Sequence, residues 1–170
     1  GISIAEAAMQ QALAFAAGRR QGRTPGGSGA IIDHADVRRM LGLMKAQVFA
    51  ARAIALSCAV AIDMARATAD PAWAARAALL TPSNKAYGTE TGCEVANTGI
   101  QVHGGMGFIE ETGAAQFARD VRVTAIYEGT NGIQAMDLVG RKMMDGGEAA
   151  YRLIDEMQTE AEAARQRHPD

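Results

Sequence analysis

The sequence predicts an all-α fold, an antiparallel four-helix bundle. Hydrophobic residues make up 48% of the 170 residues and aromatic residues only 5%, so alanine, leucine, isoleucine and methionine must fill the core. Such a composition favours helix over strand. An apolar pattern at helical spacing runs from Val37 to Ala65 without interruption, and no stretch shows the alternation of a strand. Several long helices with short links are typical of an antiparallel bundle.

The first helix is expected from about Ile4 to Ala17. It ends in the Gly- and Arg-rich stretch Gly18–Arg23, and the loop Thr24–Gly29 follows. Because glycine and proline in this loop interrupt both helix and strand, the next helix starts beyond it.

The second helix is the clearest element. Asp33 is its predicted N-cap, and Asp36 lies in the first turn, where the helix dipole favours an acidic side chain. The helix must end by Asp70, because Pro71 disfavours helical geometry in the residue before it. Its apolar seam, expected to face the other helices, comprises Val37, Leu41, Met44, Val48, Ala51, Ala55, Cys58, Ile62 and Ala65.

The third helix is predicted to begin with Thr81 as N-cap and Pro82 at the first helical position. It continues to about Val102, and Gly104–Gly107 ends it. A short helix is expected over Thr112–Asp120. The residues expected to point inward from the third helix are Ala86, Cys93, Ala96 and Ile100.

The fourth helix is capped by Thr130 or Asn131 and is expected to stop near Gly146. One of its faces carries Ile133, Met136 and Val139. Residues 147–170 form a separate amphipathic segment that becomes polar towards its end. The chain is therefore divided into a helical bundle, residues 1–146, and a tail or linker, residues 147–170, that leads towards an extension missing from this chain.

Charge and composition exclude several classes of function. The net charge of −2 lacks the basic excess of nucleic-acid binders. We expect no membrane span, since no apolar run approaches the roughly 20 residues required, and the first ten residues lack a signal-peptide pattern. A bacterial cytoplasmic location is expected. Cys58 and Cys93 are predicted to be small buried hydrophobic residues in a reducing compartment. The three histidines lie far apart in the sequence, so no metal site is predicted.

A glycine-rich segment, Ile100–Phe108, is the first candidate for chemistry. Its glycines let backbone amides approach a ligand closely. The segment follows a predicted helix rather than a strand, which argues against a dinucleotide-binding fingerprint. On spacing alone, a simple helix end remains the favoured explanation and a ligand-binding loop is the alternative.

Glu128, between Tyr127 and Gly129, is the second candidate. A carboxyl group in an apolar setting has a raised pKa, which suits a general base working near neutral pH. The following helix N-terminus and the Thr130 hydroxyl could bind an anion or a polar edge of a cofactor. From the residues alone, the favoured interpretation is that Glu128 is only a favourable charge near a helix N-terminus.

Three segments together resemble the C-terminal domain of acyl-CoA dehydrogenases in both order and spacing. They are Gln101–Phe108, Arg119–Arg122 and Ile126–Gln134. The stretch Arg19–Arg23 also resembles the Arg-containing turn after the first helix of that domain. The resemblance covers about residues 4–144.

The resemblance implies a four-helix bundle at the core of a homodimer or homotetramer. Enzymes of this family oxidise an acyl-CoA thioester to the trans-2-enoyl-CoA, with FAD accepting a hydride from the β-carbon while a glutamate removes the α-proton. An electron-transfer flavoprotein is the expected electron acceptor. Glu128 matches the catalytic glutamate, and Tyr127 and Gly129 match positions near the substrate.

The resemblance also implies the cofactor-binding residues. Arg19 matches the arginine that meets the FAD diphosphate, which suits a guanidinium fork. Thr130 and Asn131 match positions that contact the flavin. The stretch that packs on the adenosine and diphosphate, typically from the neighbouring subunit, matches Gln101, Val102, His103, Gly104 and Gly105.

The chain departs from the family pattern in ways that limit these expectations. Gly132 stands where the family often has a glutamine, so one cofactor contact is absent. The motifs resemble a subgroup with an extra C-terminal extension, which includes methylthio-propionyl-CoA and long-chain dehydrogenases. The family's N-terminal helical domain and middle β-domain are missing, so this fragment alone is expected to bind FAD weakly or not at all and to be inactive. The alternatives are a non-catalytic helical oligomerisation module and a relative of acyl-CoA or nitroalkane oxidases.

Overall fold

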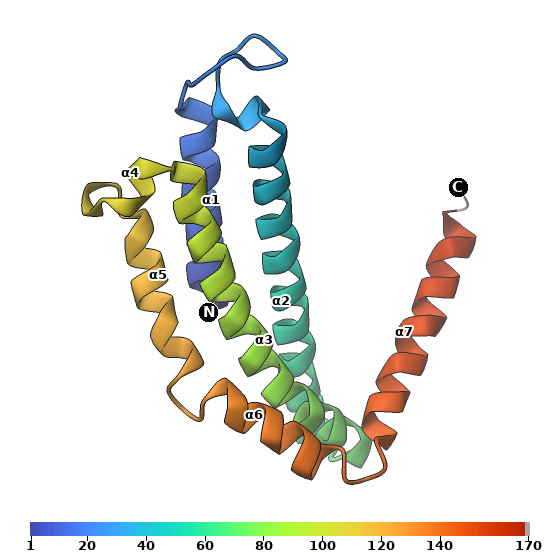
Figure 1. The fold of residues 1–170 in the computed structure, drawn as a ribbon. Coiled ribbons are helices and arrows are strands. Elements are labelled where there is room, and N and C mark those ends of the chain that lie inside the picture. The colour runs from blue at the N-terminus through green and yellow to red at the C-terminus, as the bar shows by residue number, and fades with distance from the viewer. Residues whose placement is uncertain (169–170) are drawn as a thin grey trace.

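The computed structural model describes residues 1–168 of the chain. Four helices lie side by side and alternate in direction (Figure 1): α1 (Ile2–Gly18), α2 (Ala35–Thr68), α3 (Pro71–His103) and α5 (Ala114–Arg122). The described residues form no extended strand, only an isolated bridge between Arg20 and Ala30. The all-α fold and the antiparallel four-helix bundle are therefore confirmed.

The core lies where α1, α2 and α3 meet. The buried face of α1 is a row of small side chains at helical spacing, Ala5, Ala8, Ala12 and Ala16. Because alanine takes little room, larger side chains from α2 and α3 fill the space against this face. Met44 and Val95, from those two helices, are among the largest fully buried side chains. The alanine-rich composition thus reflects close helix packing.

The seam predicted for α2 faces this core. Its middle residues Leu41, Met44, Val48, Ala51 and Cys58 are buried, and the residues near its ends are half-buried. The predicted N-cap was wrong, however, because His34 rather than the preceding aspartate occupies that position.

Asp33 lies instead in a 3-10 turn, Ile31–Asp33, that precedes α2. Its carboxylate accepts a hydrogen bond from the Ser28 hydroxyl. The turn packs its first residue, Ile31, into the core. Tertiary packing of that side chain therefore displaced the helix start from the position that local capping preference favours.

The start predicted for the third helix was also wrong. A single helix, α3, begins at Pro71 and passes through Pro82, which is fully buried. Proline cannot donate to the carbonyl four residues earlier. The side-chain hydroxyls of Thr81 and Ser83 bond to backbone carbonyls on either side of this gap. Packing in the core therefore outweighs the local cost of an internal proline.

The cap of α3 is Asp70, whose Oδ1 accepts a hydrogen bond from the backbone N–H of Ala72 at 2.8 Å. Replacing Asp70 with alanine leaves that donor without its partner, and we expect the free energy of unfolding to fall by about 1 kcal/mol. Urea unfolding followed by circular dichroism measures the change. Asp70→Asn keeps an acceptor oxygen and serves as the control. Equal unfolding midpoints for the alanine variant and the parent would contradict this cap.

The fourth position of the bundle is filled by several short elements in succession. After α3 come α4 (Gly105–Phe108) and a 3-10 turn (Glu110–Thr112), and then α5. A second 3-10 turn (Val123–Ala125) leads to α6 (Asn131–Asp137), which continues as a turn of π-helix (Leu138–Lys142). In Figure 1, α5 and α6 follow α3 along its length.

Of the two predicted caps for this last helix, Thr130 is the observed one, since its hydroxyl accepts from the N–H of Ile133. The helix is shorter than expected and ends at Lys142 rather than near Gly146. Its predicted apolar face is not buried: Ile133, Met136 and Val139 are all exposed. This chain leaves an apolar surface uncovered beside the Glu128 segment.

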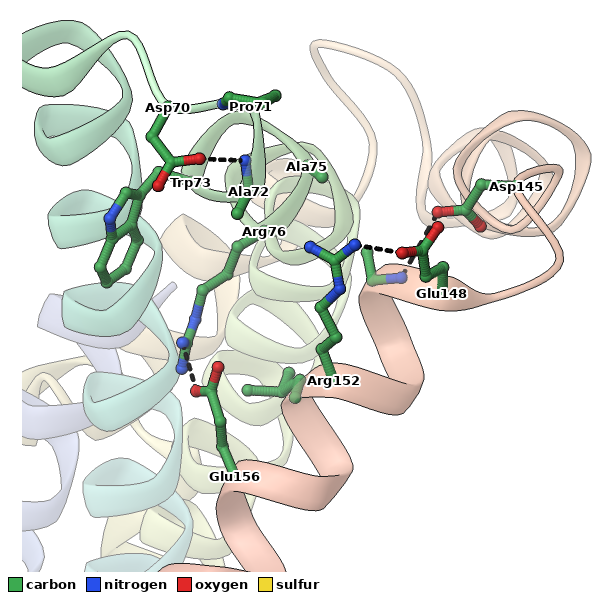
Figure 2. Close-up of a pocket in the computed structure, with 12 residues that line it drawn as sticks. Asp70, Pro71, Ala72, Trp73, Ala75, Arg76, Asp145, Glu148, Arg152 and Glu156 are labelled. Atoms are coloured by element: carbon green, nitrogen blue, oxygen red, sulfur yellow. Dashed lines mark hydrogen bonds and ion pairs between the residues drawn. The ribbon is translucent and has the colours of Figure 1, made fainter.

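The last helix, α7 (Glu148–Arg167), diverges from the bundle and has no buried residue (Figure 1). It touches the bundle at the start of α3, where Arg76 pairs with Glu156. Figure 2 shows the pocket of about 720 Å³ between these two helices. Its charged groups are engaged locally, with Arg152 bonded to Glu148. Assignment of residues 147–170 to a separate tail or linker stays a prediction.

Among the described residues, α2 has the length and composition of a membrane-spanning helix, with a mean hydropathy of 1.8 over its most apolar 18 residues. The apolar stretch is therefore longer than was expected from the sequence, whereas the expected absence of a membrane span stays a prediction. Only 22% of that window is buried, and its exposed side chains include Phe49 and Leu56. One such helix is weak evidence for a membrane span, because a core helix of a bundle has similar composition. Here α2 packs against α1 and α3 through its seam.

Candidate active site

The arginine turn and the glycine loop meet at one end of the bundle. Helices α1 and α3 both end there (Figure 1), so Arg19, just after α1, lies near the end of α3. A hollow of about 350 Å³ separates them. It is lined by Phe15, Arg19, Gln21, Ile31, Gln101, Val102, His103, Gly104, Gly105 and Met106. The structure thus brings together the residues predicted to meet the adenosine and diphosphate of FAD.

Within this cluster, the buried members have structural partners. The ring of His103 stacks on that of Phe15 with centroids 4.3 Å apart. Its Nδ1 lies 2.7 Å from the carbonyl oxygen of Gly99, which can only accept, so Nδ1 carries the proton. Val102 is also buried. These two residues shape the hollow from within the bundle.

The exposed members are the ones that can face a ligand. They are Arg19, Gln101, Gly104 and Gly105. Among the described residues, no acidic side chain pairs with the Arg19 guanidinium, which leaves its donors available for an anion. A Cβ added at Gly104 or Gly105 would meet nothing within 4 Å, so the backbone there is open to close approach. A diphosphate with an attached nucleoside fits this combination of a free cation and an open backbone.

The second cluster is the turn between the 3-10 helix Val123–Ala125 and α6. Glu128 and Gly129 both have left-handed backbones, with φ of 53° and 84°. A non-glycine residue adopts this region only rarely. The carbonyl oxygen of Gly129 accepts a hydrogen bond from Lys85 Nζ at 2.7 Å. The turn is therefore an unusual conformation that is tied to α3.

Glu128 is exposed, as is Tyr127 beside it. The enclosed apolar setting expected for the base is thus not supplied by this chain alone. The chain does supply exposed apolar side chains near the turn. Val123 and Ile126 precede it and Ile133 follows it, and each is more than half exposed. We call these uncovered side chains, on the segments that flank the turn, the apolar wall.

The two clusters lie at opposite ends of α5 (Figure 1). The nine residues of that helix span about 14 Å at 1.5 Å per residue. Arg19 and the glycine loop therefore do not share a pocket with Glu128 within one chain. This arrangement suits the expectation that Gln101–Gly105 serve the cofactor of a neighbouring subunit.

The sequence reasoning missed three residues of α3 that surround the turn. Lys85, Thr89 and Glu90 all bond to the side chain of Asn131. Lys85 and Thr89 are four residues apart, so they lie on the same face of the helix. Polar residues at helical spacing on the inward side of α3 were the available signal, but their partners lie more than 40 positions away.

The fold is a helical domain in which the two clusters of predicted site residues lie at the surface. The family described as "Acyl-CoA dehydrogenase, C-terminal domain" matches residues 1–144. The 3-methylmercaptopropionyl-CoA dehydrogenase of Ruegeria pomeroyi is 48% identical over 91% of this chain and 28% of its own length. The chain therefore belongs to the acyl-CoA dehydrogenase family and corresponds to its C-terminal domain.

Solved structures agree with this assignment. The butyryl-CoA dehydrogenase from Megasphaera elsdenii matches 82% of this chain and 33% of its own, with a TM-score of 0.69 and 27% identity. Caenorhabditis elegans ACDH-11 in complex with C11-CoA shares the fold over 97% of this chain and 28% of its own, with a TM-score of 0.80 and 20% identity. This chain thus spans about a third or less of the length of these relatives.

Proposed function

We propose that this chain is the C-terminal part of a FAD-dependent acyl-CoA dehydrogenase in which Glu128 removes the substrate's α-proton. The observation that supports this role most directly is the exposed carboxylate on a turn tied to α3, beside an uncovered apolar wall. The left-handed backbone of Glu128 costs free energy and persists because the surrounding structure holds it, which makes the turn a candidate for a functional role. The wall needs a partner surface, and a substrate chain together with another domain would supply one.

The residues of this chain have distinct tasks in the proposed reaction. Bound FAD supplies the hydride acceptor. Glu128 takes the α-proton onto its carboxylate, and closure of the apolar wall excludes water from that carboxylate. Gly129 leaves room for a backbone amide to approach the thioester oxygen, where negative charge develops as the proton leaves. The Thr130 hydroxyl caps α6 and keeps its own proton free to donate to a cofactor.

At the other end of the bundle, Arg19 and Gln101 face the FAD diphosphate and adenosine, with Gly104 and Gly105 allowing close approach. Because this hollow is remote from Glu128 within one chain, we assign it to the cofactor of a neighbouring subunit. The protein would then work as a homodimer or homotetramer. We also propose an electron-transfer flavoprotein as acceptor, an acyl-CoA as substrate and the bacterial cytoplasm as location.

The subgroup with a C-terminal extension remains our proposal for this chain. The long α7 after the bundle supports it. The ACDH-11 fold covers 97% of the chain, whereas the butyryl-CoA dehydrogenase covers 82%. The 48% identity to a 3-methylmercaptopropionyl-CoA dehydrogenase makes short thioether acyl-CoA substrates the first to test.

The complete enzyme that contains this chain is expected to purify with FAD and to lose its visible flavin absorbance when an acyl-CoA is added without oxygen. The isolated chain should be colourless and inactive, because it presents the cofactor-facing loops without the rest of the pocket. Absorbance spectra and enoyl-CoA formation measure both expectations. A complete enzyme whose flavin is not reduced by any acyl-CoA would refute the proposed activity. An isolated chain that is yellow and active would refute the expectation that other domains complete the FAD pocket.

A further inference from the structure

Lys85, on α3, connects that helix to the turn that carries Glu128. Its ammonium group donates to the carbonyl oxygen of Gly129 at 2.7 Å and to Oδ1 of Asn131 at 2.9 Å. Hydrogen bonds from a charged donor are stronger than neutral ones, and Lys85 is half-buried, which limits competition from water. A single cation therefore holds both Gly129, the second residue of the turn, and Asn131, the first residue of α6.

Asn131 is fully engaged by the same helix. Its Oδ1 faces Lys85 and lies 3.1 Å from the Thr89 hydroxyl, and its Nδ2 donates to Glu90 at 2.6 Å. The amide orientation follows from charge, because the ammonium requires the oxygen and the carboxylate requires the nitrogen. Asn131 is therefore an anchor between α3 and the turn.

The conformation that this network holds is one that needs support. Glu128 has φ of 53° and Gly129 has φ of 84°, and two successive left-handed residues reverse the chain direction sharply. The other side-chain contact to the backbone of the turn is long, with Gln134 Nε2 3.4 Å from the carbonyl oxygen of Glu128. The short bond from Lys85 restrains the next peptide, Gly129–Thr130, and so fixes the exit from the two left-handed residues.

We propose that Lys85 is a positioning residue for the base: it orients the Glu128–Gly129 turn so that the carboxylate and the adjacent backbone amide meet the substrate together. This inference rests on the proposed role of Glu128. Among the described residues, no carboxylate lies within ion-pair distance of Lys85. The two groups that accept hydrogen bonds from its ammonium are the Gly129 carbonyl, in the turn, and the Asn131 side chain, at the start of α6. Lys85 therefore affects the reaction only by holding the turn that carries Glu128.

The test compares Lys85→Met with the parent in the complete FAD-loaded enzyme. A base displaced by about 1 Å loses on the order of 10²-fold in rate, so we expect kcat to fall by that factor. The KM for acyl-CoA should change little, because the apolar wall is intact. The isotope effect with α-deuterated substrate should increase, since proton removal becomes more strongly rate-limiting. Lys85→Arg keeps the cation and its donors and should recover most of kcat.

The matched control is Lys45→Met, the same change at an exposed position of α2, which should leave kcat unchanged. A Lys85→Met enzyme with the parent's kcat and isotope effect would overturn the inference. If Lys85→Met does not yield folded enzyme, Lys85→Gln decides. Its amide is one bond shorter, so kcat should still fall at least tenfold, about 1.4 kcal/mol of barrier, and the parent's kcat would overturn the inference.

Failure of this inference is separable from failure of the proposed function. Glu128→Gln in the same enzyme tests the base directly. Full turnover by Glu128→Gln would refute the proposed role of Glu128 as the base, and Lys85 would then have no base to position. If Glu128→Gln loses turnover while Lys85→Met, or Lys85→Gln in its place, has the parent's kinetics, only the role of Lys85 is refuted.

Discussion

Replacing Glu128 with glutamine is expected to lower kcat of the complete enzyme by about 10³-fold, within the range that a positioned general base contributes. Glutamine keeps the size of the side chain and one acceptor oxygen, but it cannot accept the α-proton. Binding of acyl-CoA should survive, because the apolar wall beside the turn is unchanged. Stopped-flow measurement of flavin reduction separates the loss of proton removal from any loss of binding.

A suitable control is Glu160→Gln, on the exposed and divergent helix α7. It removes the same charge far from the turn and should leave kcat unchanged. If Glu128→Gln turned over normally while changes at the subunit contacts abolished activity, the domain would serve assembly alone, as a helical oligomerisation module. The catalytic assignment would then be wrong.

The second large effect is expected at Gly107, in the short helix α4. A Cβ placed there would lie 2.3 Å from the carbonyl oxygen of Ile100 and 2.8 Å from the Cβ of His103. Both neighbours are parts of α3 that the core holds in place. Gly107→Ala must therefore move α4 away from α3, and overpacking of this kind costs about 1–3 kcal/mol. We expect a lower unfolding temperature and weaker retention of FAD, because the same loop borders the hollow beside Arg19.

Gly105→Ala is the matched control in the same helix. Its added Cβ meets nothing within 4 Å, and its backbone does not require glycine. Differential scanning fluorimetry of the two variants should show a clear drop in unfolding temperature for Gly107→Ala only. Equal unfolding temperatures of the two variants would show that α4 can shift without cost, so its close contact with α3 would not contribute to stability.

Periodicity was a reliable guide where a helix has one buried face. The seam of α2 was predicted correctly because its burial repeats at the helical period, and the approximate range of α1 followed from the same pattern. Helix ends were less reliable. The start of α2 moved past Asp33 because burial of Ile31 set the preceding turn. Pro82 lies inside α3 because packing outweighed a local break.

The sequence motifs identified the family but did not predict which surfaces are buried. Order and spacing of the glycine loop and the Tyr-Glu-Gly-Thr segment pointed to acyl-CoA dehydrogenases, and the family match over residues 1–144 confirmed it. Neither motif carries information on which surfaces are covered. The exposure of Glu128 and the uncovered face of α6 are properties of the tertiary structure.

The amino-acid pattern by itself determined the helical class, the core seam and the family, because each of these depends on residue types at short or regular spacing. The tertiary structure alone decided three further features. Arg19 lies beside the glycine loop, Glu128 stands apart from both, and Lys85 reaches across to Gly129. The reason is physical: such contacts join residues tens of positions apart, and their partners are set by how the helices pack against one another.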